Sequence, residues 1–489
     1  MRLLPLVILL LFRFYDLGAR PPHHDEGVNG WFVDGIFDRG YYIYDPQNYH
    51  GPLYFYILAV FEKVFGRSLI VLRIPTVIFG SLISFTPFLF RKWLGRYGTW
   101  IVALVFTVSP ALIFYSRYAI HETLFVLASI FFFYYWLKVK EENFTPKNRW
   151  GFGLSLAAMV SLKENFVLYG ASLVIAEAIL SYFTKKKPFP FDKKFRVGLG
   201  ISIFIALSCI VILFTGFFQD VNGIPNFFKA FVLWFDTGEK GNGHQKPFWY
   251  WIQLMAKLEW PGLFGLLLTP LVFFKFKKVK SAKFKFIVPN EIKLVAVMSF
   301  ILLLLYSVVS YKTPWCLLGF YWGLVFVMGF WLGRWFESMK KGLKRGVVLL
   351  LFGSGLFVSL YQSYDVAYLH PDQEGHYYIY GQTFHDMMVP LNEILAKAQA
   401  KPDLRKTVRI QIISSFTWPM PFVLGEFKQT GYYGDTNAPP VLDGDEIIMD
   451  QSYEAKLFPR IKGDYIRTET RSRQWAGPVV FFKKVGGEL

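Results

Sequence analysis

Residues 345–362 read RGVVLLLFGSGLFVSLYQ, and after Arg345 this block contains no charged side chain. It is apolar on every side, whereas a helix on the surface of a soluble protein keeps one polar face. A helix of about twenty apolar residues spans the hydrocarbon core of a bilayer. Comparable blocks occur at 68–90 and 165–183. These blocks predict an α-helical protein that crosses a membrane several times.

The composition and the charge distribution favour the same class. The 489 residues are 54% hydrophobic and 18% charged, whereas about a quarter of the residues of a soluble protein are charged. The net charge of +18 would suit nucleic acid, but the basic residues lie largely in short loops between apolar blocks. Cytoplasmic loops of membrane proteins carry such an excess of Lys and Arg. We therefore expect a lipid bilayer as partner and no nucleic acid.

About eleven transmembrane helices are expected, at 3–17, 68–90, 98–115, 119–137, 150–162, 165–183, 196–217, 250–274, 291–310, 314–332 and 345–362. With the N-terminus inside, the inner loops hold 24 Lys and Arg in 61 residues and the outer loops 10 in 92. This asymmetry predicts a multi-pass protein of the plasma (inner) membrane with a cytoplasmic N-terminus. Residues 3–17 resemble the apolar region of a signal peptide, but Arg13 interrupts them and no clear cleavage site follows, which favours a retained helix.

The chain is expected to have two domains. Residues 1–362 form the transmembrane domain, in which the first outer loop (18–67) and the loop after residue 217 contain amphipathic runs, Leu53–Phe65 and Phe227–Phe235, typical of helices on the membrane surface. Residues 363–489 are richer in polar residues and predict a small extracytoplasmic α/β domain. Its expected elements are a helix at 389–400 and strands at Val408–Ser414, Glu446–Asp450 and Val479–Lys483.

The first outer loop holds the most reactive combination of residues, His23-His24-Asp25-Glu26, followed later by His50. A carboxylate at the membrane surface can act as a general base toward an attacking hydroxyl. His24 and Asp25 could instead ligate a divalent metal. A third interpretation is a solvated loop in which Asp25 caps a helix.

Three cations, Arg117, Lys163 and Lys312, are expected at the same outer face of the membrane. Ionisable residues at such positions are costly and often functional, and together these would suit a lipid phosphate. Alternatively, Arg117 pairs with Glu122, Lys163 pairs with Glu164, and Lys312 extends to the headgroups. The Gly-rich and aromatic segment 241–251, which contains His244, could form a lid or an interfacial belt. Glu259 lies inside a predicted span, facing a cavity or bonded to a neighbouring helix.

Several motifs recur here in a characteristic order: HHDEG (23–27), YDPQNYHGPLYF (44–55), SRYAIHETL (116–124), SLKENF (161–166), GNGHQKPFWYW (241–251), LEWPG (258–262) and SYKTPW (310–315). This set resembles glycosyltransferase superfamily C (GT-C), which includes protein O-mannosyltransferases and aminoarabinose transferases. It is most similar to the archaeal flippase-activity-associated glycosylation family. The resemblance covers residues 20–335.

The resemblance implies a polyprenyl-phosphate-linked sugar as donor and an acidic catalytic residue in the first outer loop. Carried over by position, that residue is Asp25 or Glu26, and Arg117, Lys163 and Lys312 fall in later motifs. Relatives often have Asp where Glu122 stands, and tend to have Glu-Lys where Tyr311-Lys312 stands. These departures leave the metal dependence and the acceptor open.

The predicted function is transfer of a sugar from a polyprenyl-phosphate donor to a glycan, lipid or protein acceptor on the outer side. Asp25 or Glu26 would be the general base, the three cations would bind the departing phosphate, and the only cofactor considered is a divalent metal. The supporting residues are His24, His50, His121, Glu122, Glu164 and His244. The alternatives are a flippase for lipid-linked sugars, its accessory subunit, or a scaffold. A transporter would have ionisable groups near mid-membrane, whereas most of these lie at one face.

Overall fold

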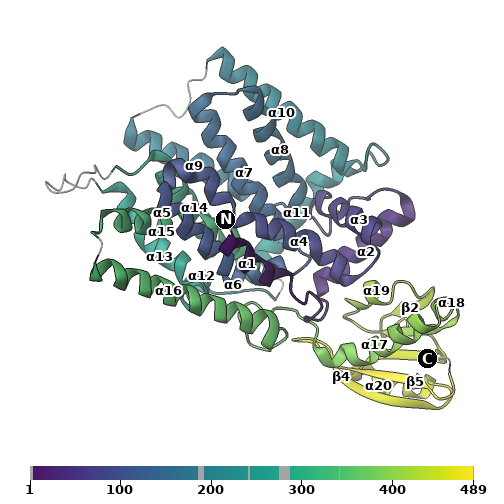
Figure 1. The fold of residues 1–489 in the computed structure, drawn as a ribbon. Coiled ribbons are helices and arrows are strands. Elements are labelled where there is room, and N and C mark those ends of the chain that lie inside the picture. The colour runs from purple at the N-terminus through teal and green to yellow at the C-terminus, as the bar shows by residue number, and fades with distance from the viewer. Residues whose placement is uncertain (1–3, 186–191, 241–242, 275–286, 341, 488–489) are drawn as a thin grey trace.

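The computed structural model describes residues 4–185, 192–240, 243–274, 287–340 and 342–487. The rest of the chain, including Gly241, Asn242 and much of the predicted inner loop at 275–290, lies outside the described residues. A large helical body is followed by a smaller C-terminal domain at one corner of the molecule (Figure 1). The helices of the body are α1 (Leu4–Phe14), α2 (His24–Arg39), α3 (Leu53–Phe65), α4 (Leu69–Ile83), α5 (Arg91–Val108), α6 (Pro110–Ser116), α7 (His121–Glu142), α8 (Pro146–Leu162), α9 (Phe166–Thr184), α10 (Lys193–Phe214), α11 (Gly223–Lys240), α12 (Tyr250–Leu258), α13 (Trp260–Leu268), α14 (Asn290–Val308), α15 (Leu318–Ser338) and α16 (Leu343–Tyr364).

Seven helical segments in the described residues are long and apolar enough to cross a membrane. They are Leu69–Val108, His121–Glu142, Phe166–Thr184, Lys193–Phe214, Asn290–Val308, Pro314–Ser338 and Leu343–Leu369. The expected number of eleven is therefore unconfirmed. The span predicted at 250–274 is broken into α12 and α13 at Glu259, because Pro261 begins a new helix and cannot continue the previous one.

The first outer loop is more ordered than the sequence suggested. The stretch after His23 forms helix α2, which the sequence analysis considered only as one alternative, with Asp25 as its cap. His23 caps this helix: its Nδ1 accepts a hydrogen bond from the Asp25 backbone N–H, and the Glu26 carboxylate accepts one from the His23 N–H. Asp25 is thus not the cap. The predicted surface helix Leu53–Phe65 is present as α3, and Phe227–Phe235 lies within α11.

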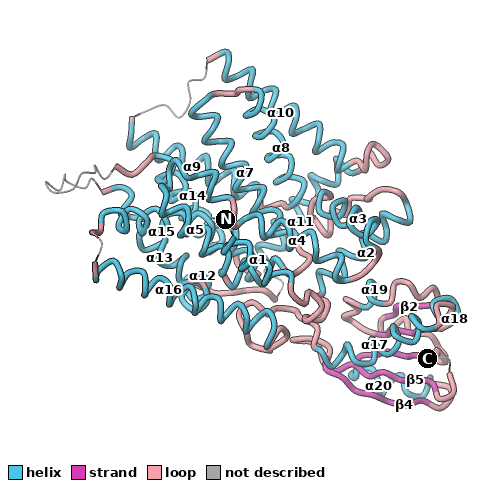
Figure 2. Tube along the Cα trace, viewed as in Figure 1, coloured by secondary structure: helices cyan, strands magenta, loops and turns pink. Residues whose placement is uncertain are grey.

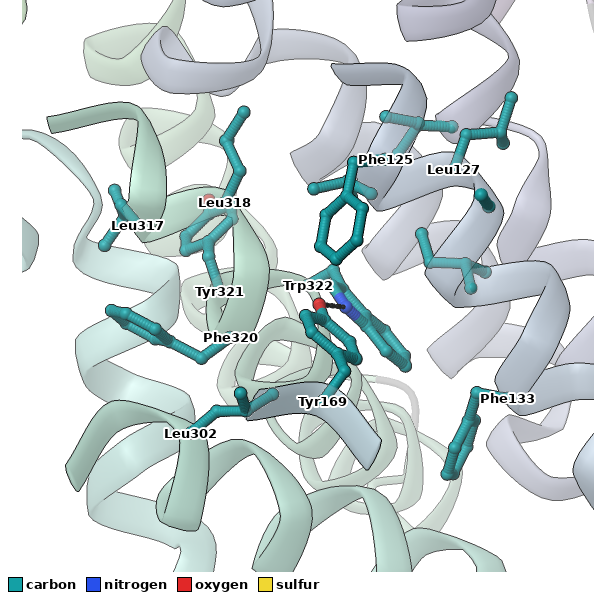
Figure 3. Close-up of a cluster of buried hydrophobic side chains, with 14 of the residues drawn as sticks. Phe125, Leu127, Phe133, Tyr169, Leu302, Leu317, Leu318, Phe320, Tyr321 and Trp322 are labelled. Carbon is teal, nitrogen blue, oxygen red and sulfur yellow. Dashed lines mark hydrogen bonds between the residues drawn. The ribbon is translucent and has the colours of Figure 1, made fainter. Parts of the chain in front are cut away.

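At the centre of the helical body the helices pack closely, and buried polar groups form hydrogen bonds with one another. α5 and α15 approach closely through glycines: a Cβ on Gly98 would lie 2.8 Å from the Gly329 carbonyl oxygen. Figure 3 shows Tyr169 and Trp322 among buried side chains such as Phe125. The Trp322 indole N–H donates to the Tyr169 hydroxyl at 2.8 Å. This bond fixes both rings at the junction of α9 and α15.

The C-terminal domain contains every β-strand among the described residues (Figure 2). Its strands β1 (Arg409–Ile413), β2 (Gln429–Tyr433), β3 (Glu446–Asp450), β4 (Tyr465–Arg471) and β5 (Pro478–Lys484) form one sheet in the order β2-β1-β3-β5-β4. β1 runs parallel to β2 and β3, and β5 runs antiparallel to β3 and β4. The helices are α17 (His385–Ala400), α18 (Leu404–Thr407), α19 (Met420–Val423) and α20 (Gln451–Leu457).

The C-terminal domain packs against the first outer loop. α2 and α19 meet so closely that a Cβ on Gly27 would lie 2.7 Å from the Pro419 Cα. His23 forms an isolated antiparallel bridge with Gln382, in the segment that leads into the domain. The fold therefore brings the reactive residues of the first outer loop next to a domain more than 350 residues later in the chain.

Candidate active site

A cavity of about 1070 Å³ lies between the helical body and the C-terminal domain. Its walls come from α2, the loop before α3, the start of α7, the turn between α8 and α9, α11, the turn after α14 and the C-terminal domain. Eight of the eleven residues predicted for the site line this cavity: His24, Asp25, His50, His121, Glu122, Lys163, Glu164 and His244. Apolar side chains, including Leu168, Trp234, Val308 and Val309, line another part of it.

Asp25 presents its carboxylate to this cavity from the first turn of α2. Its side chain is 37% exposed, and His23 Nδ1, 3.9 Å from its carboxylate, accepts a hydrogen bond from the Asp25 N–H and so carries no proton. The protein around it removes much of its hydration, and this desolvation raises the pKa of Asp25 to about 6. Asp25 is therefore a carboxylate whose proton affinity suits acid–base chemistry near neutral pH.

Two further carboxylates of the cavity, Glu122 and Glu164, are held by partners, and a fourth, Glu239, is exposed at the end of α11. Glu122 forms an ion pair with Lys163, and both side chains are almost fully buried. Glu164 contacts the imidazole of His50, with 3.0 Å between its Oε2 and the His50 Nδ1. The pairs considered as alternatives, Lys163 with Glu164 and Arg117 with Glu122, are thus not formed, and Lys163–Glu122 and His50–Glu164 form instead. His121 packs its ring 4.6 Å from that of His50.

Glu26 does not line the cavity and instead forms a buried ion pair with Arg73. Its carboxylate accepts hydrogen bonds from Arg73 Nε and Nη2 at 2.7 and 2.6 Å and from the Ala119 N–H at 2.9 Å. Burial alone would raise the pKa of Glu26, but Arg73 outweighs burial and lowers the pKa to about 2. The structure thus does not support Glu26 as an alternative to Asp25, because a carboxylate held in this way cannot reach an acceptor.

Two of the three predicted phosphate-binding cations also point elsewhere. Arg117 donates to the carbonyl oxygens of Arg13, Tyr15 and Asp16 and to the Tyr368 hydroxyl, which ties the end of α6 to the end of α1. Lys312 donates to the carbonyl oxygens of Lys246 and Val309. Neither side chain lines the cavity. The expected convergence of Arg117, Lys163 and Lys312 is therefore wrong, and Lys163 alone of the three reaches the site.

The sequence analysis missed two cations that do line the cavity, Lys246 and Arg473. Arg473 lies in the segment between β4 and β5, and its Nη1 donates to His24 Nδ1 at 2.8 Å. Desolvation and the neighbouring Arg473 lower the pKa of His24 to about 4. No local sequence pattern around Arg473 distinguishes it from the other basic residues of this polar domain.

The suggested metal at His24 and Asp25 does not fit the arrangement. Within the described residues there is no group of three or more His, Cys, Asp and Glu side chains placed to hold a metal ion. The His24 Nδ1 lone pair is also taken by the Arg473 hydrogen bond. No chemical step is therefore assigned to a metal here.

Comparisons with known proteins agree with the motif resemblance. The sequence model of the family described as dolichyl-phosphate-mannose-protein mannosyltransferase matches residues 49–213, about a third of the chain. No curated protein is significantly similar to the chain in sequence.

Two solved structures share the architecture. ArnT from Cupriavidus metallidurans bound to undecaprenyl phosphate is similar with a TM-score of 0.65 at 13% identity, over 98% of this chain and 97% of ArnT. The archaeal oligosaccharyltransferase AglB from Archaeoglobus fulgidus, in complex with an inhibitory peptide and a dolichol-phosphate, is similar with a TM-score of 0.54 at 12% identity, over 93% of this chain and 70% of AglB.

The narrower resemblance to the flippase-activity-associated family stays a prediction. The fold of this chain is thus similar to that of ArnT, with a large helical body and a small C-terminal sheet domain, and residues 49–213 resemble the mannosyltransferase family.

Proposed function

We propose that this protein is a membrane glycosyltransferase that moves a sugar from a polyprenyl-phosphate-linked donor to an acceptor on the extracytoplasmic side. The matched family and ArnT with its bound undecaprenyl phosphate support this class of donor. The cavity suits such a donor, since it combines an apolar region at Leu168, Val308 and Val309 with polar groups around Asp25.

The observation that carries the proposal is the position of Asp25. Glu122 and Glu164 are occupied by Lys163 and His50, whereas Asp25 has no Lys or Arg within ion-pair distance among the described residues. Glu239 also lines the cavity, but it is exposed at the end of α11, so Asp25 is the partly buried carboxylate of the cavity that is available to accept a proton.

The proposed step is a single displacement. The acceptor O–H gives its proton to the Asp25 carboxylate while the acceptor oxygen forms a bond to the anomeric carbon of the sugar. The bond between that carbon and the phosphate oxygen breaks, and the polyprenyl phosphate leaves with the electron pair. The configuration at the anomeric carbon is inverted. Cationic groups of the cavity stabilise the charge that develops on the phosphate.

A complementation experiment tests the proposal. A deletion strain carrying wild-type protein or Asp25→Asn is analysed by mass spectrometry of surface glycans and lipid-linked sugars. We expect the deletion to remove a glycan and to accumulate its lipid-linked donor, and only the wild type to restore it. The matched control is Asp38→Asn, since Asp38 is exposed on the same helix and does not line the cavity.

Other results would contradict the proposal in distinct ways. Restoration of the glycan by Asp25→Asn at equal protein level would remove Asp25 from the mechanism. Movement of labelled lipid-linked sugar between leaflets by the purified protein, with no transfer product, would favour the flippase alternative.

A further inference from the structure

Arg473 is a buried cation that the C-terminal domain contributes to the wall of the cavity. It is 6% exposed and lies in the connection from β4 to β5, together with the cavity-lining residues Gln474 and Trp475. Two contacts fix this connection: Thr383 and Arg473 form an isolated antiparallel bridge, and the Phe384 N–H donates to the Ser472 carbonyl oxygen at 2.9 Å. The position of the guanidinium is therefore set by the backbone around it.

The partners of Arg473 are neutral. Nη1 donates to His24 Nδ1 at 2.8 Å, and Nη2 donates to the carbonyl oxygens of Phe416, at 3.2 Å, and Trp418. Among the described residues, no carboxylate lies within ion-pair distance of the Arg473 guanidinium. A buried charge without a counter-ion is costly, and an anion in the cavity would relieve that cost.

The other cations of the cavity are less suited to this role. Lys163 is already neutralised by Glu122. Lys246 is only half-buried, and its Nζ lies 5.7 Å from the centre of the Tyr380 ring. A guanidinium also presents several N–H donors in one plane, which matches the oxygens of a phosphate better than an ammonium does. The three hydrogen bonds of Arg473 leave further N–H groups for a ligand.

We propose that Arg473 binds the phosphate of the polyprenyl carrier, in the donor and in the departing product. This inference rests on the proposed function, which requires a phosphate to leave inside this cavity. It replaces Arg117 and Lys312, which the sequence analysis assigned to this task. It also makes the C-terminal domain a part of the active site, because the domain supplies the cation and lines the cavity with Trp475, whose ring lies 4.9 Å from that of Tyr380.

The test measures binding of undecaprenyl phosphate to the purified full-length protein in nanodiscs. We expect Arg473→Gln to weaken binding at least about tenfold, since the variant loses charge-assisted hydrogen bonds to the phosphate. Arg473→Lys should bind with intermediate affinity because it keeps the charge without the planar fork. The matched control is Arg471→Gln, two residues earlier, whose side chain is 62% exposed and pairs with Asp386 outside the cavity.

Two further probes separate the phosphate from the rest of the ligand. Undecaprenol, which has the same tail without the phosphate, should bind equally to wild type and Arg473→Gln. Inorganic phosphate should compete with undecaprenyl phosphate in the wild type. An equal loss of undecaprenol binding in Arg473→Gln would mean that the arginine only shapes the cavity, and would overturn the proposal.

The stability of the domain contact is checked in parallel, because Arg473 also bonds the Phe416 and Trp418 carbonyls. Thermal unfolding and proteolysis of the segment 370–384 should be unchanged in Arg473→Lys. The lower affinity of this variant for undecaprenyl phosphate would then reflect the lost contact with the phosphate. Unchanged affinity for undecaprenyl phosphate in Arg473→Lys and Arg473→Gln would show that Arg473 does not bind the phosphate. That result would not contradict the proposed transferase function. Failure of the wild type to bind undecaprenyl phosphate would instead count against the proposed function itself.

Discussion

The guanidinium of Arg73 donates two hydrogen bonds to the carboxylate of Glu26, at 2.7 and 2.6 Å, and both side chains are fully buried. Asp25, one residue earlier, points into the cavity instead. The two neighbouring carboxylates therefore have different tasks. Glu26 joins α2 to α4, and Asp25 is free to take part in chemistry.

Replacing Glu26 should lower the stability of the protein. Any loss of transfer should follow from that loss of stability. Glu26→Gln leaves the Arg73 charge buried without its counter-ion, and breaking such a pair costs about 3–5 kcal/mol. We expect a clearly lower thermal midpoint in detergent or nanodiscs. Asp38→Asn, at an exposed position of the same helix, should change the free energy of unfolding by less than about 0.5 kcal/mol. Equal stability of Glu26→Gln and the wild type would show that the pair is dispensable.

Transfer should depend on pH through the ionisation of Asp25. Its pKa is raised to about 6, chiefly by desolvation, and only the ionised carboxylate can accept the acceptor proton. The rate should therefore be level above about pH 7 and fall roughly tenfold per unit well below pH 6. His24 has a pKa lowered to about 4 and is therefore neutral above pH 5. Its titration should not change the transfer rate in that range. A profile of kcat/KM that is flat between pH 5 and 7 would exclude Asp25 as the general base.

The buried pair of Lys163 and Glu122 is suited to a double-mutant cycle. Each side chain is almost fully buried, so Lys163→Met or Glu122→Gln alone leaves a charge without its partner and should cost about 3–5 kcal/mol. The double variant should cost less than the sum of the two, with a coupling of about 0.5–3 kcal/mol in unfolding measurements. Strict additivity would mean that the two residues act independently, and Lys163 would again be a candidate for binding phosphate.

Local patterns of the sequence predicted much of the fold. The amphipathic run Leu53–Phe65 became α3 with the same bounds, and the apolar strand Glu446–Asp450 became β3, because burial is decided by the hydrophobic residues of the segment itself. β4 was missed because Tyr465–Arg471 is mostly exposed and polar. Its pairing with β5, rather than its own composition, makes it a strand.

The site was predicted less completely, because its residues meet through long-range contacts. The position of a charged residue near the end of a span indicates its depth in the membrane, but not the direction of its side chain around the helix. Arg117 and Lys163 therefore looked equivalent, yet Arg117 turns to the end of α1 and Lys163 turns into the cavity. Arg473 could not be found, since only the docking of the C-terminal domain brings it to His24.

Glu259 gives a last contrast between a buried carboxylate that supports the fold and the cavity-lining carboxylate of Asp25. It lies at the break between α12 and α13, where its carboxylate accepts hydrogen bonds from the Ser109 hydroxyl at 3.0 Å, the Ala111 N–H at 2.6 Å and the Tyr378 hydroxyl at 3.1 Å. It does not line the cavity. These bonds connect the kinked helix to the start of α6 and to the segment that leads into the C-terminal domain.

Glu259→Gln should therefore lower stability while transfer per folded molecule stays close to that of the wild type. The loss should be about 1–3 kcal/mol, since the amide keeps only one of the two oxygens that accept hydrogen bonds from buried donors. Tyr378→Phe removes one of the donors and should cost about 1 kcal/mol. Thermal unfolding and a transfer assay on the same preparation separate the two effects. Loss of transfer in Glu259→Gln at unchanged stability would show that this carboxylate takes part in the reaction, although it does not line the cavity.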